Sequence, residues 1–436
     1  MMRPHALARS MLGFGLALSA LLHGAACVAA PVPTPSLSPA PLVRAVVRSD
    51  PAVAMAGVAL FIDAGLVRQR AAKPGLAALT AQAVVETPVD GVPLRDAVEA
   101  VGASLDAATG PERVRFYLEG PPAALASAAR LVARALGAPS FAAATLAAAR
   151  ADLDARREET ERDPRAVGVE VLRGSYYREA AATPPLGTPA ALAALSPDDL
   201  RAFYRAWYVR GGAAIGAVGA PGDAIDAAVA VLGGALAPGN VAPAHVEARP
   251  LAAKPKEIVT HRDVVAPYVV AGFAAPALGD RDFPAVLVVR AAIESLLDAP
   301  GAVTRPIPLR AVGSIYAYDV APAHLAVWLN GLRRDPAVGL AALAAVLKAA
   351  AEKPLDAAVL ARYKERAAGA WSVGSLSLDA RAYAIGSAVA RGLDPDIEAQ
   401  VPAAVRAVTA ADVRRVAQRW FQRFDVALVL PRDAGQ

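Results

Sequence analysis

The clearest pattern of apolar and polar positions lies near the start of the chain, at residues 58–87. Residues 58–62 are apolar and rich in β-branched side chains, which is typical of a buried strand. Asp63 ends this run. After a loop, Pro74 opens a segment whose apolar residues recur at helical spacing, since proline fits the first turn of a helix. The pattern predicts a strand, a loop and a helix in this order.

A second pattern, at residues 196–218, predicts a capped helix followed by a strand. Ser196 is a good N-cap, and Asp199 stands where a capping box places an acidic side chain. The same order recurs about 210 residues later in the chain. The matched pairs are Thr409 with Ser196, Asp412 with Asp199, Arg414 with Arg201, Trp420 with Trp207, and Arg423 with Arg210.

The start of the second half also repeats the start of the first. Residues 268–274 predict a strand, and Pro284 opens a helix about 210 residues after Pro74. One capped helix is too common to argue for a repeat, but two matches at nearly the same spacing indicate a duplicated domain.

The N-terminus has the features of a secretory signal. Arg3 and Arg9 precede an apolar run of signal length, and small residues follow it. Between the two halves, a stretch rich in Pro, Gly and Ala lacks periodicity and is typical of a linker. The predicted segments are a signal peptide at 1–30, a Pro/Ser-rich leader at 31–42, an N-terminal domain at 43–236, a linker at 237–255 and a C-terminal domain at 256–436.

Two further interpretations of the N-terminus stay open. The apolar run is short for a membrane span, but it is also compatible with a retained anchor. Cys27, the sole cysteine, lies in a sequence similar to a bacterial lipoprotein box. Removal of the segment leaves no thiol, which suits an oxidising compartment. We expect an exported, periplasmic protein, with lipidation of Cys27 as the alternative to a free N-terminus.

Composition narrows the functional classes. Of the 436 residues, 56% are hydrophobic, which is ample for full cores, and alanine favours helices. The charges, 45 Lys and Arg against 40 Asp and Glu, are nearly balanced. Basic residues form no stripe interleaved with aromatics, so we do not expect nucleic-acid binding.

The first strand, loop and helix resemble the opening of the insulinase/pitrilysin-type zinc peptidases, a family that includes the mitochondrial processing peptidases. In active members the helix carries H-x-x-E-H, two His for zinc and a Glu as general base. Here Ala78 and Gln82 replace the two His, and Ala81 replaces the Glu. Alanine has no donor atom, and a neutral amide is a poor zinc ligand. The segments that carry the resemblance are 58–87, 97–120, 186–219, 278–295 and 309–320.

The resemblance implies an α+β fold of two duplicated domains, each a mainly antiparallel sheet with helices packed on one side. It also implies a partner, because degenerate members often pair with an active subunit and help to form its peptide chamber. In such pairs the degenerate subunit supplies an Arg and a Tyr that contact the substrate in the partner's site. The matching residues here are Arg310 and Tyr316, in a motif one residue shorter than the family's. A surface arginine and a strand tyrosine are the alternative.

Other catalytic chemistry is not evident in the sequence. His245, His261 and His324 have no second His or Cys at metal-ligand spacing, so we expect surface or hydrogen-bonded histidines. Acidic residues at 158, 159 and 161 lie near the stretch where active relatives place a further zinc ligand, but we interpret them as surface charges. Nucleophile-elbow and phosphate-loop motifs are also absent from the sequence.

The sequence therefore leads to one main hypothesis and two alternatives. The main hypothesis is an exported, non-catalytic subunit that binds no cofactor and pairs with a zinc-bearing H-x-x-E-H homologue, helping to bind the peptide substrate. The first alternative is a structural or peptide-binding scaffold with no role in proteolysis. The second is an active peptidase with unusual ligands, which the simultaneous loss of three required side chains disfavours.

Overall fold

We describe a computed structural model of the chain. The described residues are 43–298, 311–330, 336–352 and 355–432, and all of them belong to the compact unit Ala40–Gln436. The predicted signal peptide and leader, Cys27 and Arg310 lie outside the described residues.

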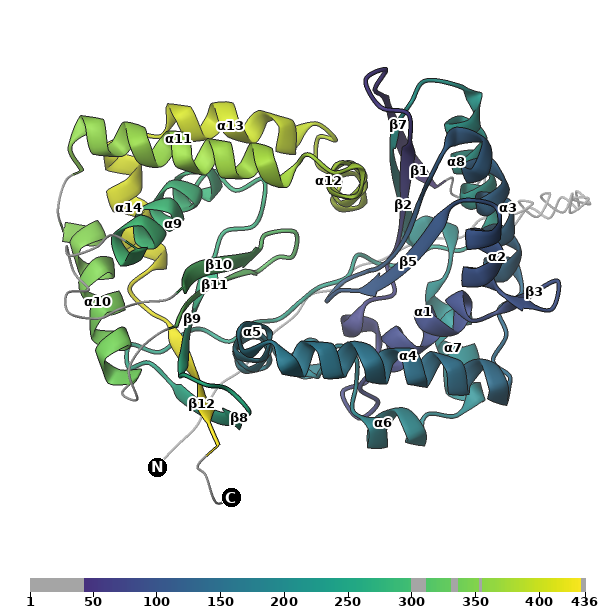
Figure 1. Ribbon diagram of the computed structural model, residues 1–436, viewed down its shortest axis with the longest axis horizontal. Helices are drawn as coiled ribbons and strands as arrows, with labels where there is room; N and C mark the ends of the chain where they lie inside the picture. The colour runs from purple at the N-terminus through teal and green to yellow at the C-terminus, as the bar shows by residue number, and fades with distance from the viewer. Residues whose placement is uncertain (1–42, 299–310, 331–335, 353–354, 433–436) are drawn as a thin grey trace, which may run out of the picture. The chain divides into compact units, whose positions relative to one another are not determined.

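The N-terminal half contains a five-stranded sheet in the order β1-β7-β2-β6-β5 (Figure 1). β1 pairs with β7 in parallel, and the other pairings are antiparallel. A small hairpin, β3 and β4, lies outside this sheet. The strands are β1 (Arg44–Ser49), β2 (Ala56–Ile62), β3 (Pro88–Val89), β4 (Val92–Pro93), β5 (Ser104–Thr109), β6 (Val114–Gly120) and β7 (Ala213–Gly219).

Helices of the same half cover one face of this sheet. Alternate residues of β2, Val58 and Leu60 among them, join apolar residues of these helices in one core, as the period of a strand requires. The helical segments of the N-terminal half, including α5, which packs elsewhere, are α1 (Leu76–Val85), α2 (Leu94–Ala100), α3 (Pro122–Gly137), α4 (Ala143–Arg162), α5 (Pro164–Tyr176), α6 (Pro189–Ala194), α7 (Pro197–Trp207) and α8 (Asp223–Ala235), with short 3-10 turns at Leu66–Arg68, Glu179–Ala182 and Arg210–Gly212.

The C-terminal half repeats this topology in a second five-stranded sheet, β8-β12-β9-β11-β10. Its outer pair, β8 and β12, is parallel like β1 and β7, and the rest is antiparallel. The elements are β8 (Glu257–Arg262), β9 (Tyr268–Ala275), α9 (Phe283–Asp298), β10 (Ala311–Ala317), β11 (Ala323–Asn330), α10 (Pro336–Glu352), α11 (Ala357–Gly374), α12 (Leu378–Arg391), α13 (Ile397–Ala407), α14 (Ala410–Trp420) and β12 (Asp425–Pro431). The predicted α+β class with two duplicated domains is confirmed.

The repeated helix-to-strand unit forms for the same local reason in both halves. Ser196 accepts a hydrogen bond from the Asp199 amide, and the Asp199 carboxylate accepts one from the Ser196 amide. Thr409 and Asp412 form the same reciprocal pair at the start of α14. A capping box satisfies two main-chain donors that the first turn would otherwise leave unpaired.

Each sheet is also covered on its second face by a helix from the other half. α12 packs against β7 and β2, where Phe61 of β2 belongs to one apolar cluster with Ala382 and Ile385. α5 packs against β9 and β12, where Leu172 belongs to one apolar cluster with Val270. The two halves therefore exchange one helix each.

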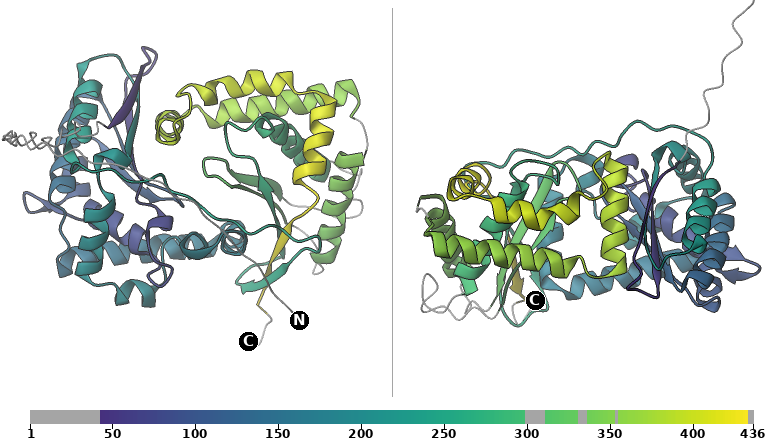
Figure 2. Two further views of the ribbon diagram at one scale, coloured as in Figure 1. Left: turned by 180° about the vertical axis from the view of Figure 1, so that it is seen from behind. Right: turned by 90° about the horizontal axis from the view of Figure 1, so that it is seen from above.

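Figure 2 shows α11 and α13 side by side in the helical layer of the C-terminal half.

The segment between α8 and β8 contains no helix or strand, but it is held against the body of the protein. Val246 and Leu251 are buried beside Tyr176 and Tyr177 at the end of α5. Arg249 donates to Asp425 at the start of β12. Among the described residues, no helix is both long enough and apolar enough to cross a membrane.

Candidate site at the degenerate metal motif

The positions that match the metal motif lie on α1, and the whole helix is buried. Ala78 and Gln82 are four residues apart and therefore share one helix face, with Ala81 beside them. Two of the three side chains end in a methyl group, which offers a metal no lone pair. The third is an amide. The helix keeps the spacing of the family motif without its ligands or its general base.

An ion-pair network lies beside Gln82. Its side-chain amide donates to Glu86 over 3.1 Å between Nε2 and Oε1. The Arg95 guanidinium lies 3.7 Å from the same Glu86 oxygen and donates to Asp152 of α4 over 3.1 Å. One arginine therefore joins carboxylates from the end of α1 and from α4. These half-buried contacts fix the two helices together through a side-chain cation.

The network continues from α4 across the edge of the sheet. Arg156 lies 2.7 Å from Asp152 and 3.4 Å from Asp106 of β5. Arg115 of β6 lies 3.7 Å from Asp106 and also pairs with Asp379 at the start of α12. Charges of alternating sign thus connect the α1 region to the helix contributed by the C-terminal half.

The described residues contain no group of three or more His, Cys, Asp or Glu side chains arranged to hold a metal. The acidic residues Glu158, Glu159 and Glu161 near the end of α4 are exposed. His245 and His261 are exposed as well. The part of the chain that the structure describes thus offers no clustered replacement for the lost ligands.

His324 differs from the other two histidines because it is buried on β11. Its ring lies 5.0 Å from that of Tyr176 on α5. Burial, with the nearby Arg173 as a second cause, lowers the pKa of His324 to about 4. The imidazole is therefore neutral at neutral pH and packs as part of the contact between α5 and the C-terminal sheet.

Tyr316 lies on β10 and is buried in the core of the C-terminal half. Its hydroxyl donates to the main-chain carbonyl of Pro276, and its ring lies 5.5 Å from that of Phe283. Burial raises the pKa of the phenol above its ordinary value. These are the contacts of a core tyrosine, and the role of Tyr316 in a partner's site stays a prediction, as does that of Arg310.

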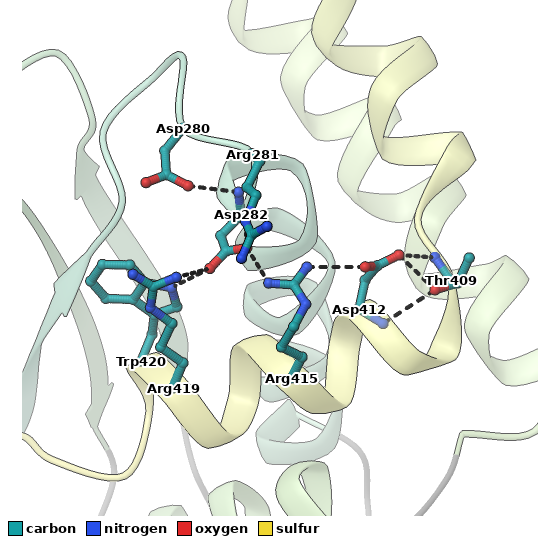
Figure 3. Close-up of polar contacts among 8 residues, drawn as sticks. All are labelled: Asp280, Arg281, Asp282, Thr409, Asp412, Arg415, Arg419 and Trp420. Atoms are coloured by element: carbon teal, nitrogen blue, oxygen red, sulfur yellow. Dashed lines mark hydrogen bonds and ion pairs between the residues drawn. The ribbon is translucent and has the colours of Figure 1, made fainter.

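Sequence reasoning missed a buried carboxylate, Asp282, which directly precedes α9 (Figure 3). Asp282 is fully buried and pairs with Arg415 and, over 3.1 Å, with Arg419 of α14. The indole of Trp420 donates to it over 3.0 Å. The spacing of Arg415 and Arg419, four residues apart on one helix face, was a usable signal that their partner would be acidic.

Comparison with known proteins relates the first part of the chain to a peptidase family. Residues 44–190 match the sequence model described as Insulinase (Peptidase family M16). No curated protein matches the chain.

Solved structures share the fold across most of the chain. The inactive domain of an M16 peptidase from Pseudomonas fluorescens is 18% identical, with a TM-score of 0.75 over 90% of this chain and 97% of that one. A protease from Helicobacter pylori is 15% identical, with a TM-score of 0.74 over 89% and 97% of the two chains. A chain of complex III2 from Candida albicans is 15% identical, with a TM-score of 0.72 over 89% and 93%. Residues 44–190 are therefore similar to the insulinase family, peptidase family M16, and the positions that match its metal motif hold Ala78, Ala81 and Gln82.

Proposed function

We propose that this protein is an exported, non-catalytic subunit that pairs with a zinc-bearing homologue and helps to bind its peptide substrate. The observation that carries the proposal is the set of residues on α1 at the positions of the metal motif. The helix retains the family's position and spacing, but Ala78, Ala81 and Gln82 occupy the ligand and base positions.

Physical chemistry supports the loss of catalysis. Zinc in this family activates water, and a carboxylate beside it removes the proton. Neither alanine nor glutamine performs these steps. The amide of Gln82 is also engaged by Glu86, and Arg95 adds a positive charge next to that carboxylate. A second cation held at this place would be opposed by the guanidinium, since like charges repel strongly where water is scarce.

The proposed role, pairing with an active homologue and helping to bind its substrate, rests on the family resemblance. The fold extends over both halves, and this supports the proposal that the chain pairs as such subunits do. Arg310 precedes β10 and is the residue expected to reach the partner's substrate. Export follows from the predicted signal at 1–30 and leads to the periplasm, where the partner must also be found.

Affinity capture of the tagged mature protein from its native envelope tests the pairing. We expect stoichiometric recovery of a homologue that carries H-x-x-E-H, and zinc in the pair but not in this chain alone. Recovery without a homologue would overturn the pairing. Sequencing of the mature N-terminus in the same preparation shows whether cleavage occurs near Ala30 or whether Cys27 is retained and lipidated.

The scaffold alternative is favoured by one observation, the burial of Tyr316. A phenol that donates to Pro276 inside its own core is poorly placed to reach a partner. The Arg310→Ala variant separates the two functions once a pair has been purified. If the chain helps to bind substrate, the peptidase rate falls while the complex stays assembled. Unchanged kinetics would leave the scaffold role.

A further inference from the structure

A cavity of about 320 Å³ lies in the helical layer of the C-terminal half. It is bounded by α9, α11, α12 and α13, and by Tyr318 just after β10. Much of its wall is apolar or aromatic. The charged residues that line it are Arg290, Glu294, Arg366 and Glu398. A cavity of this size that combines apolar walls with polar groups has the character of a site for a small organic group.

Glu398 is the unusual member of this lining. Only 8% of the surface of Glu398 is exposed to solvent. Its Oε2 accepts a hydrogen bond from the Tyr318 hydroxyl over 3.2 Å, but its buried Oε1 has no hydrogen-bond partner among the described residues. A buried carboxyl oxygen without a donor is costly. The terminal torsion of a glutamate is soft, so the carboxyl group can turn toward a donor in the cavity.

Aromatic rings accompany this carboxyl group. The rings of Tyr318 and Trp371 lie 5.1 Å apart, and the Trp371 indole donates to the main-chain carbonyl of Glu398 over 3.0 Å. Tyr383 adds a third ring to the wall. The faces of such rings attract cations, most strongly where water is excluded. A carboxylate next to aromatic rings is therefore suited to a positively charged organic group.

The other charges do not reverse this preference. Arg290 lies 3.3 Å from Glu294 and also donates to Ser314, so its charge is already compensated. Arg366 is exposed, and solvent screens its charge. Among the described residues Glu398 forms no ion pair, and it is the buried carboxyl group of the cavity lining that is left without one.

We propose that this cavity binds a primary ammonium group on an apolar stem, with the ammonium on Glu398 and the stem against Trp371 and Tyr318. Two sources carry this chemistry, a lysine side chain of a peptide and a free alkylamine. Val373 and Leu376, which are 68% and 73% exposed where α11 passes into α12, provide apolar contact for a longer ligand next to Gly374 and Ser375 of the cavity wall.

Binding should depend on pH. Burial raises the pKa of Glu398 to about 7; the nearby Asp319 also raises it, whereas the Tyr318 hydrogen bond and Arg391 lower it. Trp371 of α11, whose indole donates to the main-chain carbonyl of Glu398, does not titrate. The carboxyl group is therefore neutral in mild acid and ionised in mild base, and an ammonium ligand should bind more tightly as the pH rises from about 6 to about 8.

Calorimetry of the isolated mature chain tests the inference without any partner subunit. The probes are n-hexylamine, n-hexanol as the neutral isostere, and lysine blocked at both its α-amino and α-carboxyl groups. We expect the amine to bind at least about tenfold more tightly than the alcohol at about pH 8, and this preference to shrink at about pH 6. Tighter binding of blocked lysine than of hexylamine would identify a peptide side chain as the ligand, and the reverse would identify a free amine.

Two variants make the test specific. Glu398→Gln keeps the shape of the side chain and should remove the preference for the amine at about pH 8. Glu158→Gln changes an exposed glutamate on α4 and should leave binding unchanged. Equal binding of amine and alcohol by the unmodified protein at both pH values would overturn the proposal. So would an amine preference that survives in a folded E398Q. The pH comparison in the unmodified protein decides the matter even if E398Q does not fold.

Discussion

The two halves share a topology. In each half, a residue just before the first α-helix that follows the second strand forms an ion pair with the last α-helix before the final strand, but the acidic and basic partners are exchanged between the halves. In the N-terminal half, Lys73 before α1 pairs with Asp199 on α7. In the C-terminal half, Asp282 before α9 pairs with Arg415 and Arg419 on α14. Duplication therefore preserved the connection between the elements while the charges that make it were exchanged.

The two connections also differ in burial. The side chains of Lys73 and Asp199 are 37% and 23% exposed, whereas that of Asp282 is 0% exposed. Asp282 receives donors from two arginines and an indole, and its amide donates to Asp280 over 2.8 Å. A buried carboxylate depends on its donors far more than an exposed one does. The C-terminal half should accordingly lose more stability when its connection is removed.

Replacement of Asp282 is expected to have the largest effect. Asp282→Ala removes the acceptor for Arg415, Arg419 and the Trp420 indole and leaves a cavity beside α9. We expect the free energy of unfolding to fall by about 2–4 kcal/mol, because hydrogen bonds to charged groups are each worth about 1.5–3 kcal/mol and the arginines can partly return to water. Urea unfolding measures the change.

Asp282→Asn is the matched control, since it keeps the volume but not the charge. An intermediate loss would show that the negative charge itself contributes. If D282A were as stable as the unmodified protein, the ion pairs of Asp282 would contribute no more to the free energy of unfolding than a surface ion pair does.

Sequence reasoning recovered the local features of both halves. The capping boxes at Ser196 and Thr409 and the apolar strand 58–62 depend on residues close in the chain, so their patterns are visible in the sequence. The family resemblance then supplied the sheet-and-helix class.

The exchange of α5 and α12 between the halves could not be predicted from local sequence patterns. Its contacts join residues that are far apart in the chain, such as Gly216 and Gly386, and nothing local marks these glycines as a contact. The same holds for Glu398, whose burial depends on Tyr318 and Trp371 from other segments. Long-range packing decides these features, and local propensity does not report it.

The glycine contact between the halves should be the next most sensitive site. A Cβ added at Gly216 of β7 would overlap main-chain atoms of Gly386 and Ala382 on α12. We expect Gly216→Ala to cost about 1–3 kcal/mol through overpacking and to loosen α12. Hydrogen exchange in α12, compared with exchange in α14, measures the loosening.

Gly369→Ala on the exposed side of α11 is the control, because a Cβ there meets open space. It should stabilise the helix by up to about 1 kcal/mol. Unchanged protection of α12 in G216A would mean that the helix can shift without loss, and that the close approach of the two glycines is not required.

Two buried groups of the C-terminal half should give its stability opposite pH dependences. The pKa of His324 is about 4 in the folded chain and about 6.5 when unfolded, so its contribution is present above about pH 6.5 and is lost as the pH falls toward 4. The pKa of Glu398 is about 7 against an ordinary 4.5, so its contribution is present below about pH 4.5 and is lost as the pH rises through 7.

Melting temperatures between about pH 4 and about pH 8 separate these two contributions. His324→Leu should flatten the acid side of the profile, and Glu398→Gln should flatten the side between about pH 5 and about pH 7. A profile that neither variant alters would show that the two groups titrate alike in the folded and unfolded chain.

The more exposed of the two connections, between Lys73 and Asp199 in the N-terminal half, should respond least. Lys73→Met removes the charge that pairs with Asp199 but keeps most of the apolar stem. We expect a loss within about 1 kcal/mol, and a smaller one at high salt, because solvent and ions already screen this pair. Asp199 retains its capping contact with Ser196 in this variant, so the start of α7 should stay protected in hydrogen exchange. A loss as large as that of D282A would contradict the comparison. It would mean that the network around α1 depends on Lys73, and that burial does not explain the difference between the halves.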